Sequence, residues 1–476
     1  MMRRCYSSRS FYDAVIVGGG MVGNAMACSM GLSKALSSRK VLLLESGDPK
    51  PLKKTPEYSN RVSAIGPASV ALFKKLGIWK KLEEYRVKRV DRLEVIDSCS
   101  KSAIRFEQPN PDNEIAYIIE NNAIVAFLSD RIREKCPNVE IKTKTKVDDC
   151  ALKKPAALRI PSSLAELATL KLSDDSQVST SLIIGADGVR SRVRESFDVD
   201  YTAWEYGQKG VVATLRVQAE DNNSAAWQRF SKHGPIALLP LSDNLSSLVW
   251  TTSDEHAGRL LSLTPEEFVD ELNHYLTTNA SQSPITNQIL DLADCLLSTV
   301  CGTKLTRVPI PPTVIALQSD TRAAFPLGFG HAHSYVAPRV ALIGDAAHRI
   351  HPLAGQGVNL GYADVSTLIS CLERSVRDGA DLGALTYLSD YDSKGQRHNM
   401  PVQVVCDWIN RLYRTEATPI VFIRSLGLFA VNKLTPLKVS LHMPRVIFAN
   451  NVFALNLSHL HISLISAVEI TKIRCH

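Results

Sequence analysis

Short apolar runs followed by glycines give the first prediction for this chain. Residues 13–18, DAVIVG, form a β-branched run of the kind that fills a buried strand. A helical pattern covers 23–36, and a second apolar run, KVLLLE, covers 40–45. A strand, a helix and a strand in this order predict a βαβ unit at the start of an α/β fold.

Two later apolar runs continue this pattern, and a strand-rich segment separates them. Apolar strands are predicted at 181–185 and 339–343, each leading through glycines into a helix. Between them, 205–330 is rich in strand patterns, with a helical stretch at 265–300. The strand–glycine–helix elements therefore stand on both sides of a strand-rich insert. This order predicts one domain built from separate segments, with a second domain inserted into it.

The remaining patterns complete the predicted organisation. Alternating runs at 90–106 predict a hairpin, 118–135 is helical in pattern, and helices continue beyond 385. We predict an α/β fold with a Rossmann-like domain, an inserted strand-rich domain and a C-terminal helical region. The segments are 1–10 as a targeting segment, 11–85, 115–200 and 331–385 as the Rossmann-like domain, 86–114 and 201–330 as the inserted domain, 386–438 as C-terminal helices, and 439–476 as an atypical tail.

Composition narrows the class of protein. Hydrophobic residues make up 45% and charged residues 22% of the 476 residues, which is typical of globular domains and not of disordered chains. The net charge of +7 is a mild excess for this length and does not indicate a nucleic-acid-binding protein. The ten cysteines show no CxxC spacing, so we expect free thiols in a reducing compartment.

Basic residues gather at the two ends of the chain. Residues 1–10 carry three arginines and no acid, in the Arg- and Ser-rich composition of a mitochondrial transit peptide. Residues 391–476 carry ten Lys and Arg against four Asp and Glu, which favours contact with an anionic membrane surface. A solvated basic face is the alternative interpretation. The stretch 446–468 holds many polar groups and is predicted not to span a bilayer.

The first motif with chemistry is the glycine run at 18–23. Gly18 allows a tight turn, Gly20 lets the backbone approach a pyrophosphate, and Gly23 permits close packing of helix on strand. The helix that begins here directs its amides and its positive dipole end toward the phosphates. Glu45 ends the second strand, 27 positions after Gly18, where a ribose hydroxyl would be bound. This pattern predicts a dinucleotide site for FAD or NAD.

Two further turns join acids to glycines. Asp187 and Gly188 follow the strand at 181–185, where a plain helix cap is the alternative interpretation. Asp345 follows the strand at 339–343, and the glycines at 355 and 357 open another helix toward an anion. Two positive helix ends and two acids suit a long cofactor with a phosphate middle and hydroxyl-bearing arms. His331 and His333 lack a third ligand nearby, so we expect a surface loop there and no metal site.

The three motifs together resemble those of the FAD-dependent aromatic hydroxylases related to p-hydroxybenzoate hydroxylase. The segment 351–364, HPLAGQGVNLGYAD, is similar to a signature of the ubiquinone (coenzyme Q) biosynthesis monooxygenases, and NRVSAI at 60–65 resembles the same family. So do WQRF at 227–230 and GPIALLPL at 234–241. The resemblance covers about residues 11–438 and, with the Arg-rich start, is greatest to the mitochondrial branch of the family.

The resemblance implies a cofactor and roles for individual residues. FAD would carry the chemistry: reduced FAD reacts with O2 to form a flavin hydroperoxide, which transfers one oxygen to a phenol ring. Pro352 and Gly355 would shape the oxygen site, and no catalytic base is identified. The residues expected to bind FAD are Gly18, Gly20, Gly23, Glu45, Arg61, Asp187, Gly188, Asp345, Pro352, Gly355, Gln356, Gly357 and Asn359.

The resemblance also implies a substrate and partners. The substrate would be a polyprenylated 4-hydroxybenzoate-derived ring, hydroxylated at ring position five, with its tail in the inserted domain. Trp227, Gln228 and Phe230 are candidates for its pocket, and ordinary sheet core is the alternative for Trp227 and Phe230. The electron donor would be ferredoxin with its reductase, or otherwise NAD(P)H. The protein would join a coenzyme Q biosynthetic complex as a peripheral protein on the matrix side of the mitochondrial inner membrane.

Two other functions and one departure from the family remain open at this point. Another lipid-directed FAD enzyme of the superfamily, such as an epoxidase or a prenyl reductase, is one alternative. A non-enzymatic FAD-fold lipid chaperone is the other, although such a protein would be expected to lose the flavin-contacting motif. After Lys438 the sequence no longer resembles the family. This tail is either functional, part of an alternative isoform, or an error in the gene model.

Overall fold

The computed structural model describes residues 10–49, 51–53, 55–98, 103–107, 115–152, 167–231, 233–278, 309–319 and 321–415. Nearly all of the predicted targeting segment and the whole of the tail 439–476 lie outside these residues. The chain divides into two compact units. Unit 1 comprises 1–87, 119–206 and 328–397, and unit 2 comprises 88–118, 207–327 and 398–476.

Unit 1 is built on a parallel sheet whose strands are those predicted from the apolar runs. β1 (Ser10–Val17) lies between β2 (Val41–Leu44) and β11 (Gln177–Gly185), and it is parallel to both. All four residues of β2 and the last six of β11 are buried. The strand order is β18-β19-β11-β1-β2-β8, with β9 and β10 added beyond β11. The remaining strands of this sheet are β8 (Val139–Lys142), β9 (Val147–Leu152), β10 (Ala168–Leu172), β18 (Val336–Ala337) and β19 (Val340–Leu342).

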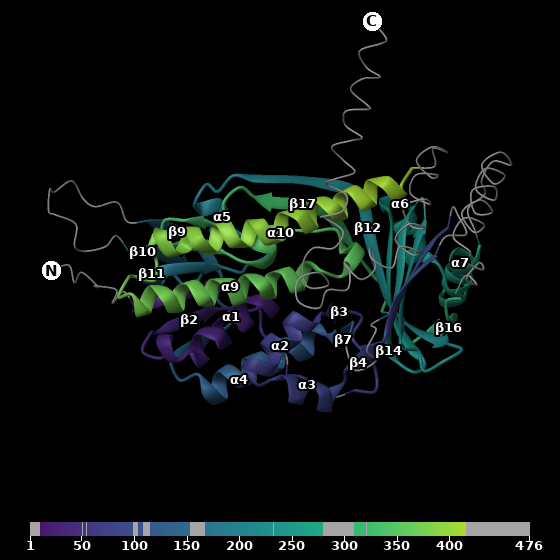
Figure 1. The fold of residues 1–476 in the computed structure, drawn as a ribbon, viewed down its shortest axis with the longest axis horizontal. Coiled ribbons are helices and arrows are strands. Elements are labelled where there is room, and N and C mark those ends of the chain that lie inside the picture. Colours follow the sequence, from purple (N-terminus) through teal and green to yellow (C-terminus); the bar gives the residue numbers. More distant parts are fainter. Residues whose placement is uncertain are drawn as a thin grey trace, which may run out of the picture. The chain divides into compact units, whose positions relative to one another are not determined.

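Helices of unit 1 lie against one another beside this sheet. α1 (Met21–Leu32) contacts both α4 (Asn121–Lys135) and α9 (Gly357–Arg377), and α2 (Pro67–Leu76) also contacts α9 (Figure 1). α1 follows β1 directly and returns the chain to β2, so the predicted βαβ unit is confirmed. The shorter elements here are β3 (Val62–Ile65), α3 (Trp79–Tyr85), α5 (Arg192–Ser196), β20 (His348–Arg349) and the 3-10 turns Lys34–Leu36, Gly344–Ala346 and Pro352–Ala354.

Unit 2 contains a largely antiparallel sheet covered on one face by two helices. Its order is β12-β15-β14-β13-β5-β6, with β16 paired to β12. The predicted hairpin is confirmed, because β5 (Arg92–Asp97) and β6 (Ala103–Glu107) pair antiparallel. Trp250, Leu248 and Ile236 pack with Phe268 and Leu272 of α7 in one buried cluster. The elements are β4 (Lys88–Val90), β13 (Ala225–Ser231), β14 (Gly234–Ser242), β15 (Leu245–Ser253), α6 (Asp254–Ser262), α7 (Pro265–Thr277) and β16 (Thr313–Leu317).

Three long elements pass from one unit into the other. β12 (Tyr201–Gln218) and β17 (Ala323–Ala332) contain unit boundaries, and so does α10 (Leu385–Tyr413), which includes Pro401. Of the predicted C-terminal helical region, residues 416–438 lie outside the described residues. The predicted Rossmann-like segments lie in unit 1 except for residues 115–118.

The structure corrects two predictions. The helix predicted over 118–135 begins only at Asn121, because Ala116–Glu120 form the strand β7 and pair with β4. His331 does not lie in a surface loop, since it is 8% exposed in β17 and pairs with His348 of β20. Of the helix predicted at 265–300, α7 covers 265–277, and residues 279–300 are not described.

Candidate active site

The glycine run at 18–23 has the shape that a phosphate-binding turn requires. Gly18 has a φ of +106°, and a Cβ on it would lie 2.3 Å from the carbonyl oxygen of Ala186. A Cβ on Gly23 would lie 1.9 Å from the carbonyl oxygen of Gly18. Gly20 differs, because no atom lies within 4 Å of its Cβ position. Two glycines are therefore required by packing, and the third leaves the backbone open to a ligand.

Asn24 and Glu45 hold this turn from two sides. The buried Asn24 side chain donates from Nδ2 to the carbonyl oxygens of Gly19 and, at 3.2 Å, of Gly20. Glu45 accepts from the Gly19 amide at 2.7 Å through Oε2 and from the Gly47 amide at 2.5 Å through Oε1. Glu45 thus lies at the end of β2 beside the turn, as predicted. The role of Asn24 was not predicted, although a polar residue on the apolar face of α1 indicated that its side chain has a specific partner.

Asp187 supports the start of α5, whose N-cap is Ser191, and a helix cap was the plainer of its two interpretations. Its carboxylate accepts from Ser191 Oγ at 2.6 Å and from the Arg192 amide at 2.7 Å. Burial raises the pKa of Asp187, although these hydrogen bonds favour its charged form. Gly188 follows with a φ of +82°, and no atom lies within 4 Å of its Cβ position. The carboxylate therefore fixes the turn, and the open backbone at Gly188 is the part available to a cofactor.

A buried arginine joins the second motif to the third. Arg194, 6% exposed, donates to the carbonyl oxygens of Val189 at 2.8 Å and of Ala346 at 2.9 Å. Its guanidinium also lies 3.8 Å from the ring centre of Tyr201. The two turns are far apart in sequence, so no local pattern could have revealed this link.

The third motif rests on a buried ion pair. Asp364 accepts from the Gly344 amide at 2.9 Å, and its Oδ2 lies 2.6 Å from His348 Nε2. Both side chains are at most 1% exposed. Burial opposes the charge on His348, but Asp364 and Asp345 outweigh it and raise the pKa of His348. Gly344 has a φ of +60°, so this pair fixes the bent backbone that carries Asp345.

Asp345 lies in the 3-10 turn Gly344–Ala346, beside that pair. Its side chain is accessible to solvent, yet protein surrounds it closely enough that desolvation raises its pKa. The charges of His348 and Arg349 act in the opposite direction. A carboxylate that is accessible but crowded suits the binding of ligand hydroxyls.

The turn that opens α9 holds the remaining motif residues. Pro352 is half-buried at the start of a 3-10 turn, and Gly355 ends that turn with a φ of +59°. Gln356 is the N-cap of α9 and makes no side-chain cap bond, and Gly357 is the first residue of the helix. Arg61, at the start of β3, is exposed. The first amides of α9 are therefore left without a side-chain cap.

Asn359 has a role that its sequence position did not suggest. Its Oδ1 accepts from Ser69 Oγ at 2.7 Å and from the Gly66 amide at 3.0 Å. Its Nδ2 donates to the carbonyl oxygens of Ala64 at 2.8 Å and of Gly355 at 3.3 Å. The amide is occupied by these four bonds, which tie the start of α9 to the start of α2. Only the backbone of Asn359 remains available for the predicted cofactor contact.

The three candidates for the substrate pocket lie on two faces of the unit 2 sheet. Trp227 packs against the buried cluster under α6 and α7. Successive strand residues face opposite sides, so Gln228 and Phe230 share the other face. There the ring of Phe230, 7% exposed, stacks on Tyr413 of α10 with centroids 4.0 Å apart. The structure therefore brings Gln228 and Phe230 together and places the half-buried Trp227 against the core cluster on the opposite face.

The residues of unit 1 fit FAD. Two helices, α1 and α9, begin at glycine-rich turns, and neither N-cap makes a side-chain bond to the helix amides. Glu45 and Asp345 add carboxylates beside those turns, and Gly20 and Gly188 leave open backbone. Among the residues that the structure describes, no three His, Cys, Asp or Glu side chains gather as a metal site. Within the same residues, no helix is long and apolar enough to cross a membrane.

Comparison with known proteins agrees with this geometry. A family model described as "FAD binding domain" matches residues 12–298 and 308–405. The crystal structure of PqsL from Pseudomonas aeruginosa, a probable FAD-dependent monooxygenase, is 20% identical with a TM-score of 0.63, covering 88% of this chain and all of that one. The p-nitrophenol 4-monooxygenase PnpA from Pseudomonas putida is 16% identical with a TM-score of 0.64, covering 92% of this chain and all of that one.

Fold and site together define a flavin-dependent monooxygenase with FAD as its cofactor. The mitochondrial ubiquinone biosynthesis monooxygenase COQ6 of Caenorhabditis elegans is 49% identical over 439 residues, which cover 91% of this chain and 95% of that protein. COQ6 of Mus musculus is 42% identical over 433 residues, covering 91% and 90%. The chain belongs to this family of ubiquinone biosynthesis monooxygenases.

Proposed function

We propose that the protein is an FAD-dependent aromatic hydroxylase of ubiquinone biosynthesis. It inserts one oxygen atom from O2 into a ring derived from polyprenyl-4-hydroxybenzoate, at ring position five. The observation that carries this proposal is the complete set of three cofactor turns, held by Asn24, Arg194 and the His348–Asp364 pair. This set occurs in a chain 49% identical to a ubiquinone biosynthesis monooxygenase. An intact flavin site disfavours the lipid-chaperone alternative.

Each turn has a defined task in the proposed enzyme. The amides of α1 and the open backbone at Gly20 bind the pyrophosphate, and Glu45 accepts a hydrogen bond from the adenosine ribose. The exposed carboxylate of Asp345 would accept hydrogen bonds from the ribityl hydroxyls. Arg61, Asp187 and Gly188 are proposed to lie near the cofactor.

The opening of α9 performs the electrostatic part of the reaction. FAD supplies electron transfer and oxygen activation when it is bound. The uncapped amides after Gln356 stand at the positive end of a 21-residue helix, and they would stabilise negative charge on a flavin ring held there. Pro352 and Gly355 form the wall of the oxygen site and exclude water from it. No side chain of this site is assigned as a catalytic base.

The sheet of unit 2 is proposed to bind the substrate. Gln228 and Phe230 share one face, where the buried stack of Phe230 on Tyr413 makes an apolar environment that suits an isoprenoid tail. Trp227 supports the sheet from its other face. The proposed donor of electrons is ferredoxin with its reductase, with NAD(P)H as the alternative. The proposed location is the matrix side of the mitochondrial inner membrane, in a coenzyme Q biosynthetic complex.

A rescue experiment tests this proposal. The chain is expressed in cells that lack their own coenzyme Q monooxygenase, and ubiquinone and its prenylated precursors are measured by mass spectrometry. We expect ubiquinone to return and the accumulated precursor to fall, whereas an Asp345→Ala control restores neither. A second version carries a family-like helix after Lys438. Rescue by this version alone would identify the natural tail as impairing. Failure of both versions, although each is expressed and binds FAD, would refute the substrate assignment.

A further inference from the structure

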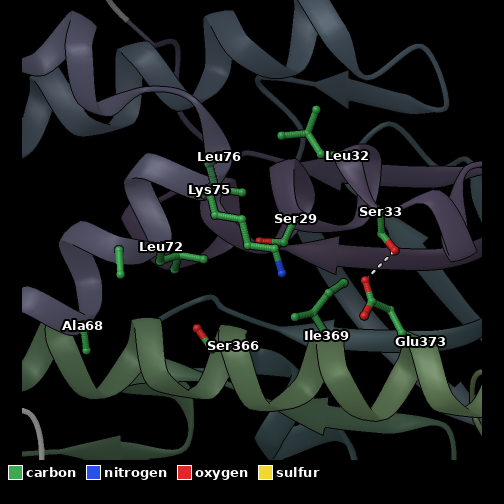
Figure 2. Close-up of a pocket in the computed structure, with 11 residues that line it drawn as sticks. Ser29, Leu32, Ser33, Ala68, Leu72, Lys75, Leu76, Ser366, Ile369 and Glu373 are labelled. Atoms are coloured by element: carbon green, nitrogen blue, oxygen red, sulfur yellow. Dashed lines mark hydrogen bonds between the residues drawn. The ribbon is translucent and has the colours of Figure 1, made fainter. Parts of the chain in front are cut away.

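A pocket lies between three helices of unit 1, apart from all the cofactor turns. It has a volume of about 330 Å³, and its walls come from the end of α1, the length of α2 and the middle of α9 (Figure 2). None of the residues proposed to bind FAD lines it. Its floor is apolar, formed by the buried side chains of Leu72, Leu76 and Ile369. Small residues on all three helices, Ser29, Ala68 and Ser366 among them, leave the space open.

Two opposite charges occupy different walls of this pocket. Lys75 extends from α2, and Figure 2 shows its nitrogen directed toward Ser29 and Ile369. Glu373 stands on α9, where Ser33 Oγ donates to its Oε1 at 2.7 Å. Neither Lys75 nor Glu373 makes an ion pair with another of the described residues. The two charges do not neutralise each other, so each is available to a ligand.

We propose that this pocket binds the zwitterionic headgroup of a phospholipid of the phosphoethanolamine type. The phosphate would pair with the exposed Lys75, and the primary ammonium, which unlike that of choline can donate hydrogen bonds, would pair with Glu373. The ethylene link would lie on the apolar floor, and the glycerol would stay at the rim. A volume of about 330 Å³ is at the small end of ligand pockets, which suits a headgroup and not a whole lipid. A purely anionic ligand would be repelled by Glu373, and a purely cationic one by Lys75.

The side of the pocket formed by α2 is exposed to solvent, and this exposure favours a membrane lipid over a free zwitterion as the ligand. Ala68, Ala71 and Lys75 of α2 are exposed beside the pocket, so a headgroup can enter while its acyl chains stay in a bilayer. The choice of a membrane lipid as the occupant rests on the membrane contact that is part of the proposed function. The match between the two charges of the pocket and a zwitterion is independent of that proposal. The hydrogen bond from Ser33 holds the Glu373 carboxylate in place before a ligand binds, which lowers the entropic cost of binding the ammonium group.

Vesicle binding by the purified, FAD-loaded full chain tests the proposal. Phosphatidylcholine vesicles with and without phosphatidylethanolamine are compared by flotation, alongside soluble glycerophosphoethanolamine measured by calorimetry. We expect binding that needs phosphatidylethanolamine and is weakened about five- to tenfold by Lys75→Glu and by Glu373→Gln. Lys74→Glu is the matched control, because it makes the same charge change one residue away on an exposed site, and it should change binding less than about twofold.

The outcomes separate this inference from the proposed reaction. Equal weakening by Lys74→Glu and Lys75→Glu would overturn the pocket in favour of general surface charge. Binding of glycerophosphoethanolamine without vesicle binding would overturn the lipid as the occupant, and binding of neither probe would overturn the site. FAD content and thermal unfolding are measured for each variant, so a folding defect is recognised. Hydroxylation of a detergent-dispersed substrate reports on the proposed reaction alone and should be unchanged in all variants.

Discussion

Two glycines of the first turn should respond differently to the same substitution. Gly23→Ala places a Cβ 1.9 Å from the Gly18 carbonyl oxygen, so it should lower the free energy of unfolding of the apoprotein by about 2 kcal/mol or more. Gly20→Ala meets no atom within 4 Å and should leave that free energy within about 0.5 kcal/mol. It should nevertheless weaken FAD binding, because its methyl group stands where the pyrophosphate approaches. Urea unfolding and flavin fluorescence measure the two effects, and equal losses of stability would refute this account of the turn.

The buried pair under the third motif makes stability depend on pH. The pKa of His348 is raised in the folded protein, so its contribution to stability is complete below its unfolded pKa of about 6.5. That contribution is lost as the pH rises through the higher folded pKa. Asp364→Asn should flatten this part of the profile and cost about 3 kcal/mol at low pH, since it leaves a buried imidazolium unpaired. Urea unfolding of the apoprotein across this pH range measures both, and an unchanged slope in the variant would argue against the pair.

At the level of elements, Asn359 fastens α9 to α2. Asn359→Ala removes four hydrogen bonds and leaves the Gly66 amide without its partner, so we expect a loss of about 2–3 kcal/mol in the free energy of unfolding. Ser366→Ala, on an exposed part of the same helix, is the control and should change it by less than about 0.5 kcal/mol. Chemical unfolding compares them, and equal effects would show that the Asn359 amide does not fasten the helices.

The helices and strands also show which parts of the fold could be predicted from sequence patterns. Strands β1, β2, β11 and β19 were predicted because continuous apolar runs between glycines are a local signal. The start of α4 was misplaced, because Ile118 and Ile119 fit a helix pattern as well as a buried strand, and only pairing with β4 decides between them. The motif glycines were likewise visible locally. The tasks of Arg194 and Asp364 were not, since the backbone groups of Ala346 and Gly344 that they bind lie 152 and 20 residues away.

For the whole molecule, the two faces of the unit 2 sheet should have separate effects on catalysis. Phe230→Leu keeps an apolar side chain but removes the stack on Tyr413, so KM should rise more for long-tailed than for short-tailed substrates. Trp227→Leu, on the core face, should lower the melting temperature while leaving the ratio of the two KM values unchanged. Steady-state kinetics with two tail lengths makes the comparison. The same shift in that ratio for both variants would contradict the assignment of the faces.

The most direct test of the proposed function follows one oxygen atom. The FAD-loaded protein is reduced without O2, mixed with a polyprenylated 4-hydroxybenzoate-derived substrate, exposed to 18O2, and its product is analysed by mass spectrometry. We predict a hydroxylated ring that carries a single 18O atom. A flavin that reoxidises while the substrate stays unlabelled, or a substrate that is reduced without gaining oxygen, would contradict the account.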